Sequence, residues 1–132
     1  MSAADDSFER GMEVRREVLG DAYVERAIGN ASPLDARFQE WLTRSACDSV
    51  WSDPTLDRRS RSLVTIAILA ALRSDELEIH LHGALNNGAT PEEVAEVLMH
   101  VGVYAGIPAA NTAFRVAKRV YVDDRAVGDR GD

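Results

Sequence analysis

Apolar residues recur at every third or fourth position along most of the chain, which is the period of an amphipathic α-helix. The strict alternation that is typical of β-strands is almost absent. Gly, Pro and Asn residues interrupt the helical pattern and mark the turns between segments. The pattern therefore predicts an all-α protein of about six or seven helices, within residues 7–19, 22–28, 32–42, 57–72, 75–87, 90–105 and 109–121.

The clearest helix boundary is the sequence Thr90-Pro91-Glu92-Glu93. A Thr three residues before a Glu forms a capping box, and Pro is favoured at the first helical position. We expect a helix to begin here and to be broken at residues 106–108. Residues 45–57 carry several turn-forming side chains and are predicted to form a loop instead.

Residues 62–72 (SLVTIAILAAL) are apolar on nearly every side of their predicted helix. A helix with this character usually needs cover on more than one face. The sequence therefore predicts that this helix is central in the fold or lies at a subunit interface.

The composition is typical of one globular domain, which we expect over residues 1–122, with a charged, disordered tail at residues 123–132. A net charge of −7 and a pI near 4.9 argue against nucleic-acid binding. No apolar run reaches the ~18 residues that span a bilayer, and the N-terminal MSAADDSFER is too acidic for a secretory signal. Cys47 is the single cysteine, so an internal disulfide is excluded. We expect a soluble, cytoplasmic protein with neither a nucleic-acid nor a membrane partner.

Glu76 and His80 are the strongest candidates for acid–base chemistry. Their i, i+4 spacing places both side chains on one helical face, where they can interact. A carboxylate beside an imidazole raises the pKa of the imidazole and orients its ring, which suits a general acid near neutral pH. A solvated Glu–His pair without a catalytic role is the alternative.

A metal site is the less favoured interpretation of the histidines. His82 lies on another side of the helix from His80, so the two cannot enter one site. Glu96 and His100 repeat the i, i+4 spacing on the next helix, but the neighbouring carboxylates indicate a solvated acidic face there. We therefore expect no metal.

Three arginines open the apolar helix, at positions 58, 59 and 61. Cations at a helix N-terminus oppose the macrodipole, so another interaction must hold them there. Ion pairs with the acidic surface and a clamp for a substrate carboxylate are equally good explanations. Tyr104 adds a hydroxyl beside a bend of small residues, where it shapes a pocket or a helix crossing.

Three segments in this order resemble the 4-carboxymuconolactone decarboxylase family: RSLVTIAILAAL, ELEIHLHGALNNGATPEEVAEVL and VYAGIPAANTAF. The stretches VRREVLGDAYVERA and FQEW extend the resemblance to about residues 8–122. It implies an all-α bundle like that of alkylhydroperoxidase D, assembled as a homotrimer or homohexamer with active sites near subunit contacts. Arg73 and Glu76 stand where the cysteines of the peroxidase would be, so peroxidase chemistry is not expected.

The resemblance implies cofactor-free decarboxylation of 4-carboxymuconolactone to 3-oxoadipate enol-lactone, a step of protocatechuate breakdown by the β-ketoadipate pathway. The substrate is a small carboxylate, and neither a metal nor another cofactor is expected. In this view His80, tuned by Glu76, donates the proton or stabilises the oxyanion, and Arg58 and Arg61 hold a carboxylate. Trp51 and Tyr104 complete the expected substrate site.

The chain departs from the family pattern in the loop at residues 47–56. Asp53-Pro54-Thr55 stands where relatives have Arg-Pro-Gly, and Cys47-Asp48 stands for Trp-Gly. An acidic residue in a pocket would repel a dicarboxylate. A divergent paralogue acting on another lactone or carboxylic acid, or a non-catalytic helical oligomer that binds a ligand, therefore remains an alternative.

Overall fold

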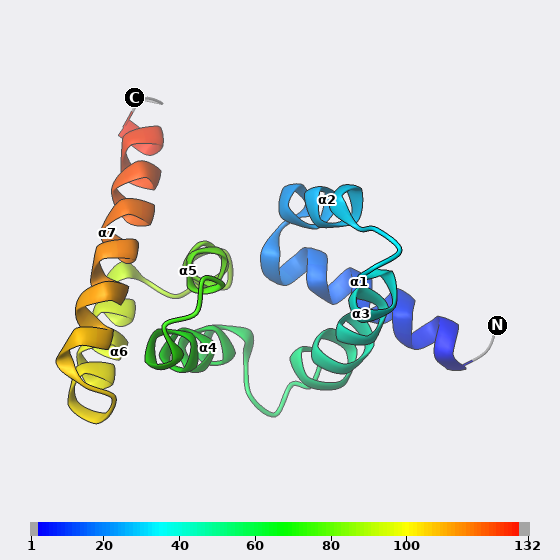
Figure 1. Cartoon of the computed structure of the whole chain (residues 1–132), viewed down its shortest axis with the longest axis horizontal. Helices are drawn as coiled ribbons and strands as arrows, with labels where there is room; N and C mark the ends of the chain where they lie inside the picture. Colours follow the sequence, from blue (N-terminus) through cyan, green and yellow to red (C-terminus); the bar gives the residue numbers. More distant parts are fainter. Residues whose placement is uncertain (1–2, 130–132) are drawn as a thin grey trace. The chain divides into compact units, whose positions relative to one another are not determined.

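A computed structural model describes the backbone of residues 3–129 and the side chains of residues 6–122. Over residues 3–129 it contains helices and turns and no strand, so the predicted all-α class is confirmed. The chain divides into two compact units, Met1–Arg58 and Arg59–Asp132 (Figure 1). The described helices are α1 (Ala3–Leu19), α2 (Asp21–Asn30), α3 (Ala36–Leu42), the π-helical segment η1 (Thr43–Trp51), α4 (Arg58–Leu72), α5 (Leu77–Asn86), α6 (Pro91–Tyr104) and α7 (Ile107–Asp129).

The first unit is built on the crossing of α1 and η1. A Cβ atom placed on Gly11 would lie 2.2 Å from the carbonyl oxygen of Thr43, so only glycine permits this approach. Beside the crossing, Val14, Val18 and Cys47 form a small buried cluster. The close backbone approach thus places the residues of η1 against the apolar side of α1.

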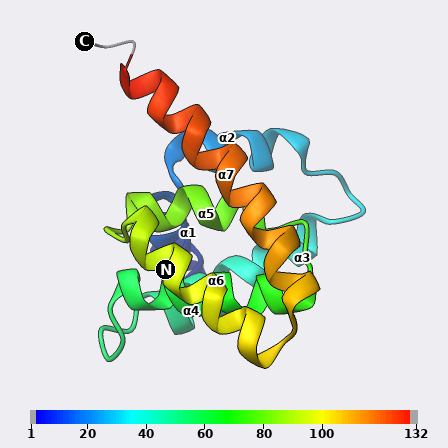
Figure 2. The ribbon, with the colours of Figure 1, turned by 90° about the vertical axis from the view of Figure 1, so that its left-hand side faces the viewer.

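The second unit has an apolar core that all four of its helices supply. α6 and α7 run side by side in opposite directions, and α5 crosses against α7 (Figure 2). Side chains with almost no exposed surface fill the space between them. The largest of these are Ile66, Leu81, Leu98, Val94 and Val120.

Helix α4 buries only one of its apolar sides within the chain. Ser62, Ile66 and Ala70 are buried. The side chains on another face, Val64, Ile68 and Leu72, are 50%, 52% and 71% exposed. The exposed residues are four apart, so they form one continuous stripe. An interface position for this stripe remains a prediction.

The predicted start of α6 is confirmed in detail. The Thr90 hydroxyl accepts a hydrogen bond from the Glu93 backbone N–H at 3.1 Å, and the Glu93 carboxylate accepts one from the Thr90 N–H at 3.0 Å. The helix ends at Tyr104, and Gly106 adopts a φ of +107° that glycine tolerates best. α7 then begins at Ile107.

The predicted loop at residues 45–57 is wrong for its first half, because residues 45–51 belong to η1. Serine hydroxyls there donate to backbone carbonyls of the preceding turn, as Ser45 does to Trp41 at 2.6 Å and Ser49 to Arg44 at 3.1 Å. Because such bonds do not by themselves favour a helix, we attribute the helical form of η1 to its contact with α1, which local propensity does not predict.

The last helix also differs from its prediction. α7 continues to Asp129 instead of ending at residue 121, so residues 122–129 are helical and not disordered. The remainder of the predicted tail, residues 130–132, lies outside the described residues. The expectation of one domain over residues 1–122 stays a prediction.

No helix among the described residues has the length and apolar character needed to cross a membrane.

Candidate functional site

Glu76 and His80 lie at the N-terminal end of α5, as their spacing predicts. Glu76 is the residue immediately before the helix, and its backbone N–H donates to the Ser74 hydroxyl at 3.1 Å. The His80 backbone N–H reaches the Glu76 carbonyl at 3.4 Å, which closes the first helical turn. The two side chains therefore project from successive turns of one face.

A buried polar contact joins the end of α5 to α4. Asn87, the residue directly after α5, donates from its side-chain amide to the buried hydroxyl of Ser62 on α4 at 3.0 Å. This buried polar contact was not predicted. The only signal for it in the sequence was Ser62, a polar residue at the start of the mainly apolar run of residues 62–72. The contact holds the end of α5 against α4. The His80 side chain, two turns earlier on α5, is partly buried.

Burial lowers the pKa of His80 below its ordinary value of 6.5, and the Glu76 carboxylate only partly opposes this effect. Glu76 does raise the pKa of His80, as the sequence predicts, but the net shift is downward, so the expected raised pKa is wrong. Glu76 is exposed, so water screens its charge, while the desolvation of the imidazole is not screened. The imidazole is thus mainly neutral at neutral pH.

The other histidines do not join His80. His82 and His100 are exposed, and the His100 ring lies against Tyr104 with 4.9 Å between ring centroids. Among the residues whose side chains are described, no three His, Cys, Asp or Glu side chains gather where a metal ion could be held.

The arginines at the start of α4 form ion pairs. Arg58 pairs with Glu17 of α1, in the first unit. Arg59 pairs with Glu93, the capping-box residue of α6, in the second unit. Arg61 is half-buried one turn before Thr65, whose hydroxyl donates to the Arg61 carbonyl at 2.7 Å. For Arg58 and Arg59, ion pairing is thus the interaction that opposes the unfavourable macrodipole.

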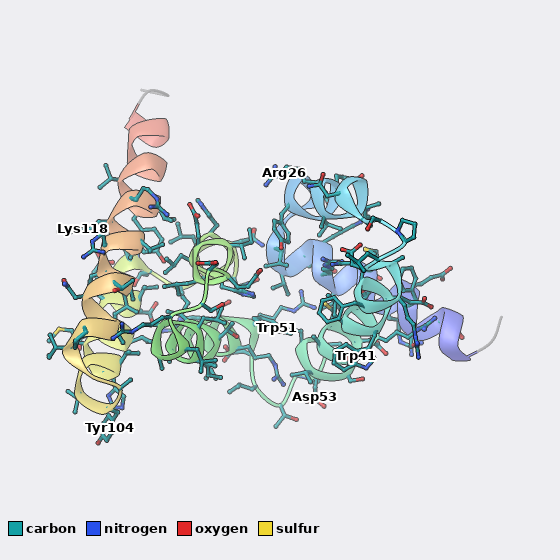
Figure 3. The ribbon with its side chains drawn as sticks, in the orientation of Figure 1. Arg26, Trp41, Trp51, Asp53, Tyr104 and Lys118 are labelled. Atoms are coloured by element: carbon teal, nitrogen blue, oxygen red, sulfur yellow. The ribbon has the colours of Figure 1, made fainter. Side chains whose placement is uncertain are left out.

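The two aromatic candidates lie in different units. Trp51 ends η1 and packs, half-buried, beside Val18 and Cys47 (Figure 3). Tyr104 is the last residue of α6 in the second unit and is 81% exposed (Figure 3). Within the second unit, the structure brings together Glu76 and His80, while Tyr104 contacts His100 instead.

The unusual residue Asp53 has a structural partner. Its carboxylate accepts a hydrogen bond from the Thr55 backbone N–H at 2.8 Å, as in the turns that aspartate commonly stabilises. Asp53 therefore stabilises the turn after η1, and this role does not require contact with a substrate.

Comparison with known proteins gives one consistent result. A sequence profile of the carboxymuconolactone decarboxylase family matches residues 36–119. The chain is 45% identical over 120 residues to the 4-carboxymuconolactone decarboxylase of Acinetobacter baylyi, covering 90% of each chain. It is 40% identical over 117 residues to the nitrosuccinic acid decarboxylase of Metarhizium robertsii, covering 88% of this chain and 82% of that protein.

Proposed function

Because the chain belongs to the carboxymuconolactone decarboxylase family, we propose that it decarboxylates 4-carboxymuconolactone to 3-oxoadipate enol-lactone without a cofactor. The observation that carries the proposal is the 45% identity to a decarboxylase of this substrate over nine tenths of both chains. The pathway in which we place the reaction is protocatechuate breakdown.

The reaction needs little from the protein beyond position and charge. When CO2 leaves, its electron pair moves through the ring double bond onto the lactone carbonyl, and a furanolate oxyanion develops. The ring carbon next to that carbonyl then takes a proton. The site must therefore supply a donor to the oxyanion, an acid for the carbon and a cation for the remaining carboxylate.

We assign the oxyanion donor to His80. A neutral imidazole keeps one N–H and is a weak acid, so it can stabilise the developing oxyanion without first losing a proton. The lowered pKa of His80 supports this role over that of an imidazolium acid. Glu76 is then a positioning residue that orients the ring from the preceding turn.

Arg58 and Arg61 are the proposed partners of the substrate carboxylate, with Trp51 and Tyr104 as further contacts. Arg58 already pairs with Glu17, so substrate must share or replace that carboxylate. We further propose one catalytic domain, because the family match crosses the boundary between the two units. The exposed Tyr104 is consistent with a site completed by a neighbouring copy in a trimer or hexamer.

Nitrosuccinate is the second candidate substrate, on the strength of the 40% identical relative. It is also a dicarboxylate, and its nitro group can take up the electron pair as the lactone carbonyl does. Both reactions thus need the same three elements. Asp53, which stands in the loop where the family has an arginine, favours a substrate other than the lactone.

The experiment is to incubate the purified chain with each substrate, following the ultraviolet absorbance of the lactone and the release of CO2 from both. His80→Ala, purified identically, controls for contaminating enzymes. Turnover of the lactone well above that of nitrosuccinate supports the first proposal. The reverse order supports the second, and no CO2 from either substrate would contradict both.

A further inference from the structure

A cavity of about 490 Å³ lies within the first unit, among α1, α2, α3 and η1. Most of its wall is apolar, formed by side chains such as Phe8, Met12, Ala27 and Ile28. A space of this size is typical of sites for small organic molecules. None of its lining residues is among those assigned to the decarboxylase site above.

One charged group of this wall, Arg15, is almost completely buried, with 5% of its surface exposed. Its Nη2 donates to the Gln39 side-chain oxygen at 3.0 Å. No enclosed nitrogen or oxygen atom of the described side chains lacks a hydrogen-bond partner. Any guanidinium nitrogen of Arg15 without a hydrogen bond is therefore accessible to solvent-sized molecules. Because Arg15 lines the cavity, these nitrogens are accessible from the cavity.

Arg15 differs from its neighbours in having a neutral partner. Arg10 pairs with Asp48 at 3.1 Å and Arg16 with Glu25 at 2.7 Å, whereas no carboxylate of the described residues lies within 4 Å of the Arg15 guanidinium. Arginine keeps its charge under all ordinary conditions. Burying such a charge without an anion is unfavourable, so an anion in the cavity would stabilise the arrangement.

The acidic groups around the cavity do not supply that anion. Glu40 is exposed and pairs with Arg44 at 2.8 Å, and Glu9 is also exposed. Carboxylates of this kind sit in water and repel a second anion only weakly. An anion that reaches Arg15 must instead lie among the apolar side chains of the wall.

We propose that this cavity binds a small amphipathic carboxylate, with the carboxylate on Arg15 and an apolar body against Phe8, Met12 and Ile28. Arg15 offers a planar pair of donors that matches a carboxylate. The low exposure of Arg15 favours a small molecule over a carboxylate on the surface of a partner protein. The site is additional to the decarboxylase site and does not depend on that assignment.

The test uses benzoate as the probe and benzyl alcohol as its uncharged counterpart, titrated into the full-length protein by calorimetry. We expect one benzoate per chain and no measurable binding of benzyl alcohol. Arg15→Met should weaken benzoate binding by about 10–100-fold, because it removes the buried cation. Arg26→Met is the matched control, since Arg26 is exposed on α2 (Figure 3) and carries the same charge.

Two further variants keep the test decisive. Ala27→Leu fills part of the cavity and leaves Arg15 in place, so it should also weaken benzoate binding if Arg15→Met fails to fold. His80→Ala should bind benzoate normally, which separates this site from the decarboxylase site. The proposal is overturned if wild type does not bind benzoate, or if both arginine variants bind it equally. It is also overturned if Arg15→Met changes the mass of the assembly by sedimentation, because a second copy then occupies the cavity.

Discussion

At the scale of single residues, His80 is governed by two opposing effects. Burial of the imidazole lowers its pKa, and the exposed Glu76 raises it by less. The net lowering of the pKa favours the neutral imidazole and the role of hydrogen-bond donor that we propose for it. Its proposed role therefore depends on its surroundings as much as on its spacing from Glu76.

Replacing His80 tests this role directly. His80→Ala should lower kcat by roughly 10²–10⁴-fold, because a missing oxyanion donor has an effect of this size. Glu76→Gln should lower kcat less, because its amide can still contact the ring. Steady-state kinetics measure both, with the exposed His82→Ala as the matched control. Near-normal turnover in His80→Ala would sink the assignment.

The pH dependence of kcat/KM separates the two possible roles of His80. The neutral donor is lost when the imidazole is protonated. Because the pKa of folded His80 lies below 6.5, kcat/KM should fall only when the pH decreases through that lowered pKa. Above 6.5 this contribution should be constant. A fall in kcat/KM with rising pH through the same range would indicate an imidazolium acid and contradict the neutral role.

The same pKa shift predicts a pH-dependent stability. Between the lowered pKa of folded His80 and its ordinary value of 6.5, the unfolded chain binds more protons than the folded one. The free energy of unfolding should therefore fall as the pH decreases through this window. Urea unfolding of wild type and His80→Gln at several pH values measures it. The difference between them should change with pH, and a constant difference would refute the linkage.

At the scale of the elements, local patterns predict the helices well where the determining contacts lie within one turn. The capping box at Thr90 and Glu93 is such a case, and the structure has both of its hydrogen bonds. The π-helical segment η1 is the opposite case. Its residues are turn formers by composition, and it is helical because it packs on α1 at Gly11.

Gly11→Ala tests the importance of that crossing. The added Cβ would lie 2.2 Å from a backbone oxygen of Thr43, so α1 and η1 must separate. We expect a loss of about 1–3 kcal/mol in the free energy of unfolding, as for other overpacked contacts. Chemical denaturation measures the loss. Gly29→Ala, where the added Cβ meets no atom within 4 Å, is the control and should stay close to wild type.

At the scale of the whole molecule, α4 carries an apolar stripe that is exposed among the described residues. Val64, Ile68 and Leu72 are each at least half exposed. Contiguous apolar residues of this kind mark contact sites between proteins. We therefore propose this stripe as a contact between subunits in the expected trimer or hexamer.

Ile68→Glu places a charge in the middle of this stripe. If the stripe lies between subunits, the variant should sediment as a smaller species than wild type, because the buried charge would lack a partner. Asn111→Glu adds the same charge at an exposed position of α7 and should leave the mass unchanged. A monomeric wild type, or an unchanged mass in Ile68→Glu, would refute the interface.

The sequence by itself determined the all-α class, the start of α6, the i, i+4 pairing of Glu76 with His80 and the family resemblance. All four features depend on the spacing of residues within one helix or on their order in the chain, and both are given by the sequence itself. Only the tertiary structure decided the lowered pKa of His80, the helical form of η1 and the cavity beside Arg15. Burial is a sum of contacts from residues far apart in the chain. Arg15 illustrates the difference, because its neutral partner Gln39 is 24 positions away in the chain.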